Sequence, residues 1–189
     1  MKQRVFVTGA TGGMGFASLK EMLKDTDKQD IVILARDSEK NRSLLAPYLQ
    51  TKGLSVEWGD LNDYEVVKKC VKGCDLVLHI AAFVSPAADY YPERAMKVNY
   101  GSTKNIINAI YDCGQENSTR LVYIGTVAET GDRMPPIHWG RVGDPIKPSM
   151  FDYYAVSKVA AERLVIESGL KYWVSLRQTG IIGKAMSEI

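Results

Sequence analysis

Residues 5–15 read VFVTGATGGMG, a short apolar run followed at once by a glycine-rich turn. A helical pattern begins where the turn ends, so strand, turn and helix follow one another directly. Because glycine lacks Cβ, the backbone of such a turn approaches a phosphate closely, and the helix start offers free N–H groups and the positive end of its dipole. This arrangement is typical of a site that holds the pyrophosphate of a dinucleotide. Its candidate residues are Gly9, Thr11, Gly12, Gly13, Met14 and Gly15.

The glycines follow the spacing Gly9-x-x-Gly12-x-x-Gly15, which differs from the G-x-G-x-x-G of ordinary dehydrogenases. A glycine-rich turn between a strand and a helix also occurs without any ligand. The turn alone therefore leaves both interpretations open, and the rest of the chain has to decide between them.

Length, composition and charge predict a single globular domain. The 189 residues are 46% hydrophobic and 24% charged, which suits a protein with its own core. The net charge of +2 does not indicate a nucleic acid or an anionic membrane as partner. No apolar run approaches the roughly 18 residues that a membrane span needs.

The cysteines and histidines do not have the spacing of a metal site. Three cysteines, an odd number, together with a start that lacks the apolar core of a signal peptide, predict reduced thiols and a cytoplasmic location. Cys70 and Cys74 lie four residues apart, and we expect them to pack in the core rather than to bind a metal.

Apolar runs alternate with helical patterns along the whole chain. Strands are expected at 5–7, 31–34, 54–58, 75–80, 120–124 and 173–177, and helices at 14–23, 38–50, 64–71, 93–113 and 154–168. This alternation predicts a doubly wound α/β fold, in which helices cover both faces of a parallel sheet. The stretch 129–152 holds four of the seven prolines, and so long a loop in a compact domain is usually functional.

The end of the second expected strand bears on the choice of dinucleotide. An acidic residue at this strand tip accepts from the ribose 2′-hydroxyl of NAD, whereas an arginine binds the 2′-phosphate of NADP. The strand is followed by Ala35 and Arg36, with Lys40 and Arg42 nearby, which favours NADP over NAD. The alternative is that Arg36 is only solvated and that Asp37 binds the ribose.

Two further strand ends supply candidates for the adenine side of the site. Asp60 and Leu61 follow the third expected strand, and Asp60 is placed to accept from the adenine amino group. The alternative is that Asp60 or Asn62 caps the next helix. Ala81-Ala82 follows the fourth strand, where small side chains leave room for a cofactor, although small residues are also common in cores.

Tyr154 and Lys158 lie four residues apart at the start of the last helix, so both side chains share one face. A lysine beside a phenol favours the phenolate and lowers a pKa that is about 10 when unperturbed, and such a tyrosine transfers protons near neutral pH. Thr126 follows the fifth strand and offers a hydroxyl for a substrate oxygen. Taken alone, the first two residues would more often be a surface pair and Thr126 a turn residue.

Together and in this order, these motifs resemble those of the extended short-chain dehydrogenases/reductases. The resemblance spans essentially the whole chain and rests on the glycine spacing, Asp60-Leu61, Ala81-Ala82, residues 98–105 around Asn99, Thr126 and Tyr154-x-x-x-Lys158. It implies a Rossmann fold, with residues 1–183 as the dinucleotide-binding domain and residues 184–189 as the start of a substrate lobe that is largely missing from the chain.

The resemblance also implies a role for each catalytic candidate. Tyr154 is implied as the general acid/base, Lys158 as the residue that binds the nicotinamide ribose and tunes Tyr154, and Thr126 as the usual serine or threonine of the site. Asn99 matches an asparagine that organises the site and its proton-relay water. The alternative for Asn99 is a purely structural hydrogen bond.

Two features distinguish the chain within this family. Arg36 makes it similar to NADP-using members such as dihydroflavonol reductases, and unlike nucleotide-sugar epimerases, which usually carry an aspartate there. Residues 176–183 are similar to an Arg-Pro-x-x-x-x-Gly-Pro stretch, but Gln178 replaces the proline and Lys184 follows the glycine. The nicotinamide side is therefore less well defined than the pyrophosphate side.

The sequence thus predicts an NADP-dependent oxidoreductase that transfers a hydride between the cofactor and a small-molecule carbonyl or alcohol. The alternatives are an NAD-dependent nucleotide-sugar epimerase or dehydratase, and an inactive NADP-binding redox sensor. The long loop indicates either an apolar or bulky substrate or ordinary packing, through Met134, His138, Trp139 and Phe151. The resemblance also implies that a homodimer could form through the helices 93–113 and 154–168.

Overall fold

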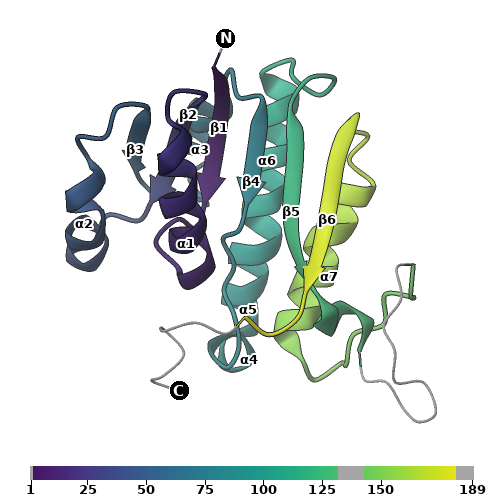
Figure 1. Ribbon diagram of the computed structural model, residues 1–189. Coiled ribbons are helices and arrows are strands. Elements are labelled where there is room, and N and C mark those ends of the chain that lie inside the picture. The colour runs from purple at the N-terminus through teal and green to yellow at the C-terminus, as the bar shows by residue number, and fades with distance from the viewer. Residues whose placement is uncertain (1, 132–142, 182–189) are drawn as a thin grey trace.

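The computed structural model describes residues 2–131 and 143–181, which form a parallel six-stranded sheet with helices on both faces (Figure 1). The strand order is β3-β2-β1-β4-β5-β6. The chain adds β2 and β3 on one side of β1 and then returns to add β4, β5 and β6 on the other side. The strands are β1 (Gln3–Thr8), β2 (Gln29–Ala35), β3 (Leu54–Trp58), β4 (Leu76–His79), β5 (Arg120–Thr126) and β6 (Tyr172–Gln178). This topology confirms the predicted doubly wound α/β fold.

The helices follow the predicted alternation. They are α1 (Gly13–Met22), α2 (Glu39–Leu45), α3 (Tyr64–Val71), α4 (Ala87–Tyr90), α5 (Pro92–Ala95), α6 (Gly101–Asp112) and α7 (Tyr153–Ile166). Three short 3₁₀ turns are η1 (Leu23–Asp25), η2 (Ala46–Tyr48) and η4 (Val127–Thr130), while η3 (Met96–Tyr100) is a π-helical segment that joins α5 to α6.

Two of the expected helices differ in detail from the structure. The helix expected over 38–50 ends at Leu45 and continues only as a 3₁₀ turn, because Pro47 cannot donate a helical hydrogen bond. The helix expected over 93–113 contains the π-helical turn η3. The short helix α4 was not predicted, because four residues are too few to show a helical period.

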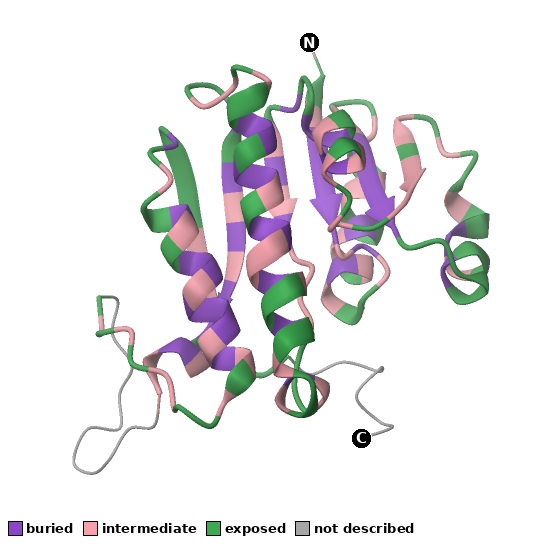
Figure 2. Cartoon of the chain, turned by 180° about the vertical axis from the view of Figure 1, so that it is seen from behind, coloured by how far each residue is buried: buried purple, intermediate pink, exposed green. Residues whose placement is uncertain are grey.

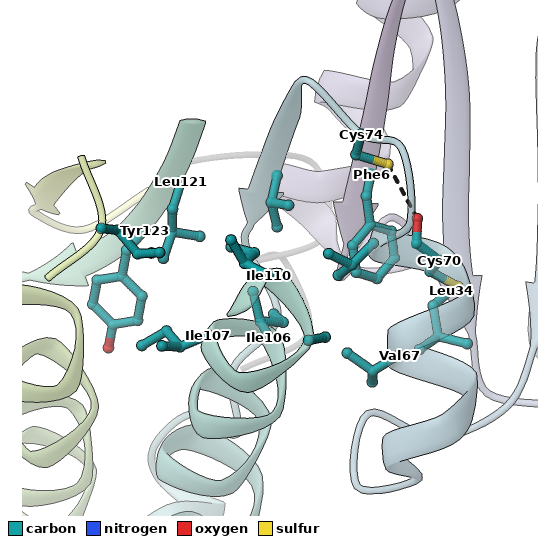
Figure 3. Close-up of a cluster of buried hydrophobic side chains, with 14 of the residues drawn as sticks. Phe6, Leu34, Val67, Cys70, Cys74, Ile106, Ile107, Ile110, Leu121 and Tyr123 are labelled. Atoms are coloured by element: carbon teal, nitrogen blue, oxygen red, sulfur yellow. Dashed lines mark hydrogen bonds between the residues drawn. The ribbon is translucent and has the colours of Figure 1, made fainter. Parts of the chain in front are cut away.

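Each face of the sheet has its own core, because successive strand residues point to opposite sides. On one face Phe6 and Val32 pack among apolar side chains of α3, α6 and α7, including Val67 and Ile110 (Figure 3). On the other face the alternate strand residues pack against α1 and α2. Buried residues accordingly follow the inner sides of the helices (Figure 2).

The two neighbouring cysteines belong to the first of these cores. Cys70 and Cys74 are free and buried, and the Cys74 thiol donates to the Cys70 carbonyl. Within residues 2–131 and 143–181, no group of three or more His, Cys, Asp and Glu side chains is arranged to hold a metal ion. None of the helices in these two ranges has the length and apolarity that crossing a membrane requires.

A buried line of hydrogen bonds joins β1 and β4 to α6. Thr8 Oγ1 accepts from the Ala81 N–H (3.1 Å) and is hydrogen-bonded to His79 Nδ1 (2.8 Å). On the other side of the ring, Thr103 donates to the Asn99 carbonyl (2.8 Å) and therefore accepts from His79 Nε2 (3.0 Å). Because Thr103 uses its one proton on Asn99, Nε2 carries the ring proton. Burial lowers the pKa of the ring to about 3, so Nδ1 is unprotonated and accepts from Thr8.

The pKa of His79 makes the fold sensitive to acid. Burial, together with the charge of Lys158, lowers this pKa to about 3, whereas the unfolded chain titrates near the ordinary value of 6.5. Below pH 6.5, His79 becomes protonated in the unfolded chain while it stays neutral in the folded protein. The stability from the neutral ring is thus present above that pH and is lost as the pH falls toward the folded value.

We expect this loss to amount to about 2 kcal/mol of unfolding free energy between about pH 7.5 and about pH 5. Urea denaturation at the two pH values measures it. The variant His79→Gln cannot titrate and should lack this part of the pH dependence. Equal pH dependence in the two proteins would contradict a neutral, buried His79.

Candidate functional site

A cleft of about 760 Å³ runs along the carboxyl ends of the strands, from the turn after β1 to the start of α7. This edge of a doubly wound sheet is where ligands bind. The predicted cofactor residues that line it are Gly9, Thr11, Gly12, Gly13, Met14, Gly15, Arg36, Asp60, Leu61, Ala81, Ala82 and Tyr154. Of the predicted cofactor residues, only Lys158 lies behind the cleft wall.

The glycine spacing has a steric cause. Gly9 has a φ of +73°, and a Cβ on it would lie 2.7 Å from the backbone nitrogen of Ala81. A Cβ on Gly15 would overlap the carbonyl oxygen of Gly9. The first and third glycines therefore let the turn fold against β4 and α1. The middle glycine, Gly12, donates to Gly9 O (2.9 Å) and is exposed.

The start of α1 is open toward the cleft. Gly12 is its N-cap residue, and no side chain accepts from the first N–H groups of the helix. Those groups have no partner within a helix, so they are available to an anion. The absence of side chains at the turn and the open helix start fit the pyrophosphate of a dinucleotide.

The end of β2 presents a cation to the cleft. Arg36 is exposed and lines the cleft together with Lys40. The neighbouring Asp37 accepts two hydrogen bonds from Arg42, of 2.6 and 2.8 Å, and Arg42 lies over the Trp58 ring at 4.6 Å. The carboxylate of Asp37 is thus already engaged, which argues against the alternative that it binds the ribose.

Asp60 is exposed and lines the cleft at the end of β3, where the adenine was predicted to bind. Its Oδ1 accepts from the backbone and the side-chain nitrogen of Asn62, at 2.8 and 2.7 Å. The alternative that Asp60 or Asn62 caps the next helix is wrong. The N-cap of α3 is Asp63, which accepts from the N–H groups of Glu65 and Val66.

Three of the four catalytic candidates meet where β5 ends beside α7. The Thr126 hydroxyl lies close enough to the phenol of Tyr154 to influence its pKa, and Tyr154 lines the cleft. Lys158 is buried one helical turn further on. Its ammonium donates to the Ile124 carbonyl (2.7 Å) and lies 4.1 Å from the centre of the Tyr123 ring.

The pKa of Tyr154 differs from the expectation. Burial and then Glu129 raise it to about 12, although the neighbouring Thr126 hydroxyl acts in the opposite direction. The sequence predicted that Lys158 would lower this pKa. In the structure the Lys158 ammonium is instead directed to a backbone carbonyl beneath the site, so burial dominates.

Asn99 uses its whole side-chain amide for structural bonds. Its Oδ1 accepts from the Phe83 N–H (2.7 Å), and its Nδ2 donates to the Phe83 carbonyl (3.0 Å) and to the Ser157 hydroxyl (2.8 Å). It therefore joins the loop after β4 to α7. It also lies in η3, and π-helical turns often mark functional sites. Its part in a proton path stays a prediction.

Several cleft residues were not identified from the sequence. Arg94 and Lys97 reach the cleft from α5 and η3, and Arg94 lies over the Phe83 ring at 4.9 Å. The signal that could have found them is their spacing of three residues in a predicted helix beside the site. The others include Ser38, Asn41, Val98 and Ile124.

Phe151 is the one substrate-facing candidate of the long loop that the structure describes. Phe151 is strongly exposed, at 87% of its surface. The loop residues Met134, His138 and Trp139 lie outside the described residues, as do 182–189 with the predicted start of the substrate lobe.

Residues 5–187 match the model of the "NAD dependent epimerase/dehydratase family". The chain belongs to this family. The match covers the glycine turn, the cleft and the Tyr154 region together, and it confirms the resemblance to the extended short-chain dehydrogenases/reductases.

The chain is also similar to individual members. A 3 beta-hydroxysteroid dehydrogenase/Delta 5-->4-isomerase of Vaccinia virus (strain Ankara) is 30% identical over 196 residues, which cover 94% of this chain and 52% of the relative. A UDP-glucose 4-epimerase of Rickettsia rickettsii (strain Sheila Smith) is 30% identical over 126 residues, 65% of this chain and 36% of the relative.

Among solved structures, the Bordetella bronchiseptica enzyme WbmH in complex with NAD+ is similar to the chain, with a TM-score of 0.78 and 25% identity. This similarity covers 97% of this chain and 58% of WbmH. The Vaccinia relative matches most of this chain, but the chain spans only about half the length of that relative.

The packing of the turn predicts opposite effects for two glycines. Gly15→Ala should lower the unfolding free energy by about 1–3 kcal/mol, because the new Cβ meets backbone that cannot move freely. Gly13→Ala is the matched control, since its Cβ would meet no atom within 4 Å. It should leave stability unchanged or raise it by up to about 1 kcal/mol. Equal urea midpoints for both variants would contradict the packing of the turn.

Proposed function

We propose that the protein is a nicotinamide-dinucleotide-dependent enzyme that transfers a hydride to or from a substrate carbon bearing a carbonyl or hydroxyl group. One observation carries this proposal: the open glycine turn and Tyr154 lie along the same cleft. The turn suits the pyrophosphate, and Tyr154 offers an acid at the other end. Membership of the epimerase/dehydratase family supports the same conclusion.

The dinucleotide supplies or accepts the hydride when it is bound. The residues of the chain manage the proton and the substrate oxygen. Tyr154 has a raised pKa and is protonated at neutral pH, so it is ready to donate to a carbonyl oxygen. We assign Thr126, whose hydroxyl influences the pKa of the phenol, to hold the same oxygen. Lys158 contributes positive charge below them, which favours the phenolate after the proton has left.

A second candidate is an epimerase or dehydratase, in which the hydride is removed and then returned. The comparisons support this alternative more than a simple reductase, because the family description and the rickettsial relative both name an epimerase. The viral relative is named a dehydrogenase and isomerase. A panel of UDP-sugars, hydroxysteroids and simple ketones separates the two. Net change in nicotinamide absorbance indicates a dehydrogenase, whereas an altered sugar without such change indicates an epimerase or dehydratase.

Two observations bear on whether the dinucleotide is NAD or NADP, and they favour different forms. The relatives favour NAD, since WbmH was solved with NAD+ and the family is described as NAD dependent. The exposed Arg36 offers a partner for the 2′-phosphate of NADP. We therefore propose NAD as the principal cofactor and Arg36 as the residue that admits NADP.

The general acid is tested by Tyr154→Phe, which removes the proton and keeps the ring. We expect turnover on any substrate that the panel identifies to fall roughly a hundred to ten thousandfold. Affinity for the reduced dinucleotide, measured by its fluorescence, should change little. The matched control is the neighbouring Tyr153→Phe, which should keep normal turnover because Tyr153 starts α7 without lining the cleft. Wild-type turnover in Tyr154→Phe would refute the assigned role.

Arg36→Ser tests the part of the cleft at the end of β2. Loss of one charge-assisted contact should weaken NADPH binding by about tenfold or more, while NADH binding stays nearly constant. Arg163→Ser removes the same charge from the exposed side of α7 and should affect neither cofactor. An equal loss for NADH and NADPH, or no loss for either, would show that Arg36 does not read the 2′-position.

A further inference from the structure

Positive charge is concentrated in the cleft. Over the whole chain, 24 basic residues nearly balance 22 acidic ones. Within residues 2–131 and 143–181, the side chains that line the cleft include one acid, Asp60, and four cations. The four cations are Arg36, Lys40, Arg94 and Lys97. A cleft lined mainly by one sign of charge focuses the electrostatic potential and attracts ligands of the opposite sign.

The cations of the cleft are not engaged with carboxylates. All four are exposed, and within the residues that the structure describes none of them forms an ion pair. By contrast, Arg42 of α2 lies outside the residues that line the cleft and is paired with Asp37. The cations that face the cleft are therefore available to an anionic ligand.

The four cations form two groups on different strands of the sheet. Arg36 and Lys40 follow the end of β2, whereas Arg94 and Lys97 lie in α5 and η3, which follow β4 along the chain. In the sheet β1 lies between β2 and β4, so the glycine turn after β1 lies between the two strand ends. The proposed function gives the first group a role at the 2′-position and leaves the second group without one.

Asn99 ties the second group to α7. Its Nδ2 donates to the Ser157 hydroxyl of that helix (2.8 Å). It also holds the backbone N–H and carbonyl of Phe83, whose ring lies 4.9 Å from the Arg94 guanidinium. Lys97 lies two residues before Asn99 in the same π-helical segment. Because α5 and η3 also pack against α7, this pair lies at the end of the cleft where α7 begins (Figure 1).

The chemistry of Arg94 and Lys97 suits an anionic oxygen group. The two residues lie three apart in consecutive helical segments, and both side chains face the cleft. A guanidinium stacked on a ring keeps its N–H groups free for two parallel hydrogen bonds to a carboxylate or phosphate, and a lysine adds a point charge. Stacking on Phe83 also orders Arg94 before a ligand arrives, which lowers the entropic cost of binding.

We propose that Arg94 and Lys97 form a second anion subsite of the cleft, which binds a carboxylate or phosphate group of the substrate. The anionic group anchors the substrate at the end of the cleft that holds Tyr154. That this ligand is a substrate rests on the proposed function. The pyrophosphate of a dinucleotide has the same chemistry, but the open start of α1 already provides for it.

A titration without substrate tests the subsite itself. Isotope-labelled protein is saturated with NADH, which fills the dinucleotide site, and its NMR signals are followed while inorganic phosphate or malonate is added. We expect a saturable shift of the signals of residues 83–99 with at least one of these probes. In the double variant Arg94→Gln, Lys97→Gln this binding should be weaker by about tenfold or more. The absence of a saturable shift with both probes overturns the proposal.

Arg120→Gln is the matched control for the loss of a stacked arginine. Arg120 lies over the Tyr172 ring at 6.0 Å, but it starts β5 and so lies at the opposite edge of the sheet. This variant should bind phosphate and malonate as the wild type does. A loss equal to that of the double variant would mean that the probes respond only to total charge, and it would overturn the proposal.

The affinity for NADH distinguishes the two sources of the anion. Measured by fluorescence, it should change little in the double variant, because the pyrophosphate meets the start of α1. A loss of NADH affinity as large as the loss for phosphate would assign Arg94 and Lys97 to the cofactor. That outcome overturns the proposal.

Paired ketones test the assignment to substrate. Each pair consists of a keto acid and its neutral ester, or of a ketone phosphate and the alcohol without the phosphate. With the wild type we expect the anionic member of at least one pair to have a KM about tenfold or more below that of the neutral member. This ratio should approach one in the double variant. Hydride transfer without any preference for anionic members refutes this inference alone, whereas saturable anion binding without any hydride transfer supports the subsite and refutes the proposed function.

Discussion

The neutral ring of His79 is the interaction on which the rest of the site depends. β1 ends at Thr8 and β4 ends at His79, and their hydrogen bond fixes the two strand ends side by side. The same threonine hydroxyl holds the N–H of Ala81, where Gly9 makes its close approach. Through Thr103 the line reaches the Asn99 carbonyl, so one ring aligns the glycine turn with the segment that supports α7.

The two ends of the cleft are built on different physical principles. The end at the glycine turn consists of backbone and of missing side chains, and the pyrophosphate proposed there would meet the free N–H groups at the start of α1. The catalytic end consists of side chains whose charges are buried behind Tyr154. The first end requires space, and the second requires compensation of charge. A substitution at the glycine turn therefore acts through overlap, whereas one at Glu129 acts through electrostatics.

The sequence predicted the fold and most of the cleft because both follow from local rules. Residues at the carboxyl ends of parallel strands meet at one edge, so Arg36, Asp60 and Ala81 converge on it whatever the details of packing. The pKa of Tyr154 could not be predicted, since it depends on burial that only the tertiary structure sets. The partners of Arg177 could not be predicted either, because they come from distant parts of the chain. The Thr-x-x-Glu pattern at 126–129 forms a capping box that was not predicted, because the stretch from Glu129 onward was expected to be a loop.

Charge balance explains how a lysine can be almost fully buried beside the site and remain useful. Arg177 donates to both oxygens of Glu162 and lies 3.2 Å from Oε2 of Glu129, so one guanidinium compensates both buried carboxyl groups. The Lys158 ammonium is held by the Ile124 carbonyl and lies over the Tyr123 ring. Burial lowers the pKa of Lys158 and raises the pKa of Tyr154 to about 12. The phenol is therefore protonated at neutral pH, which is the state in which Tyr154 can act as an acid.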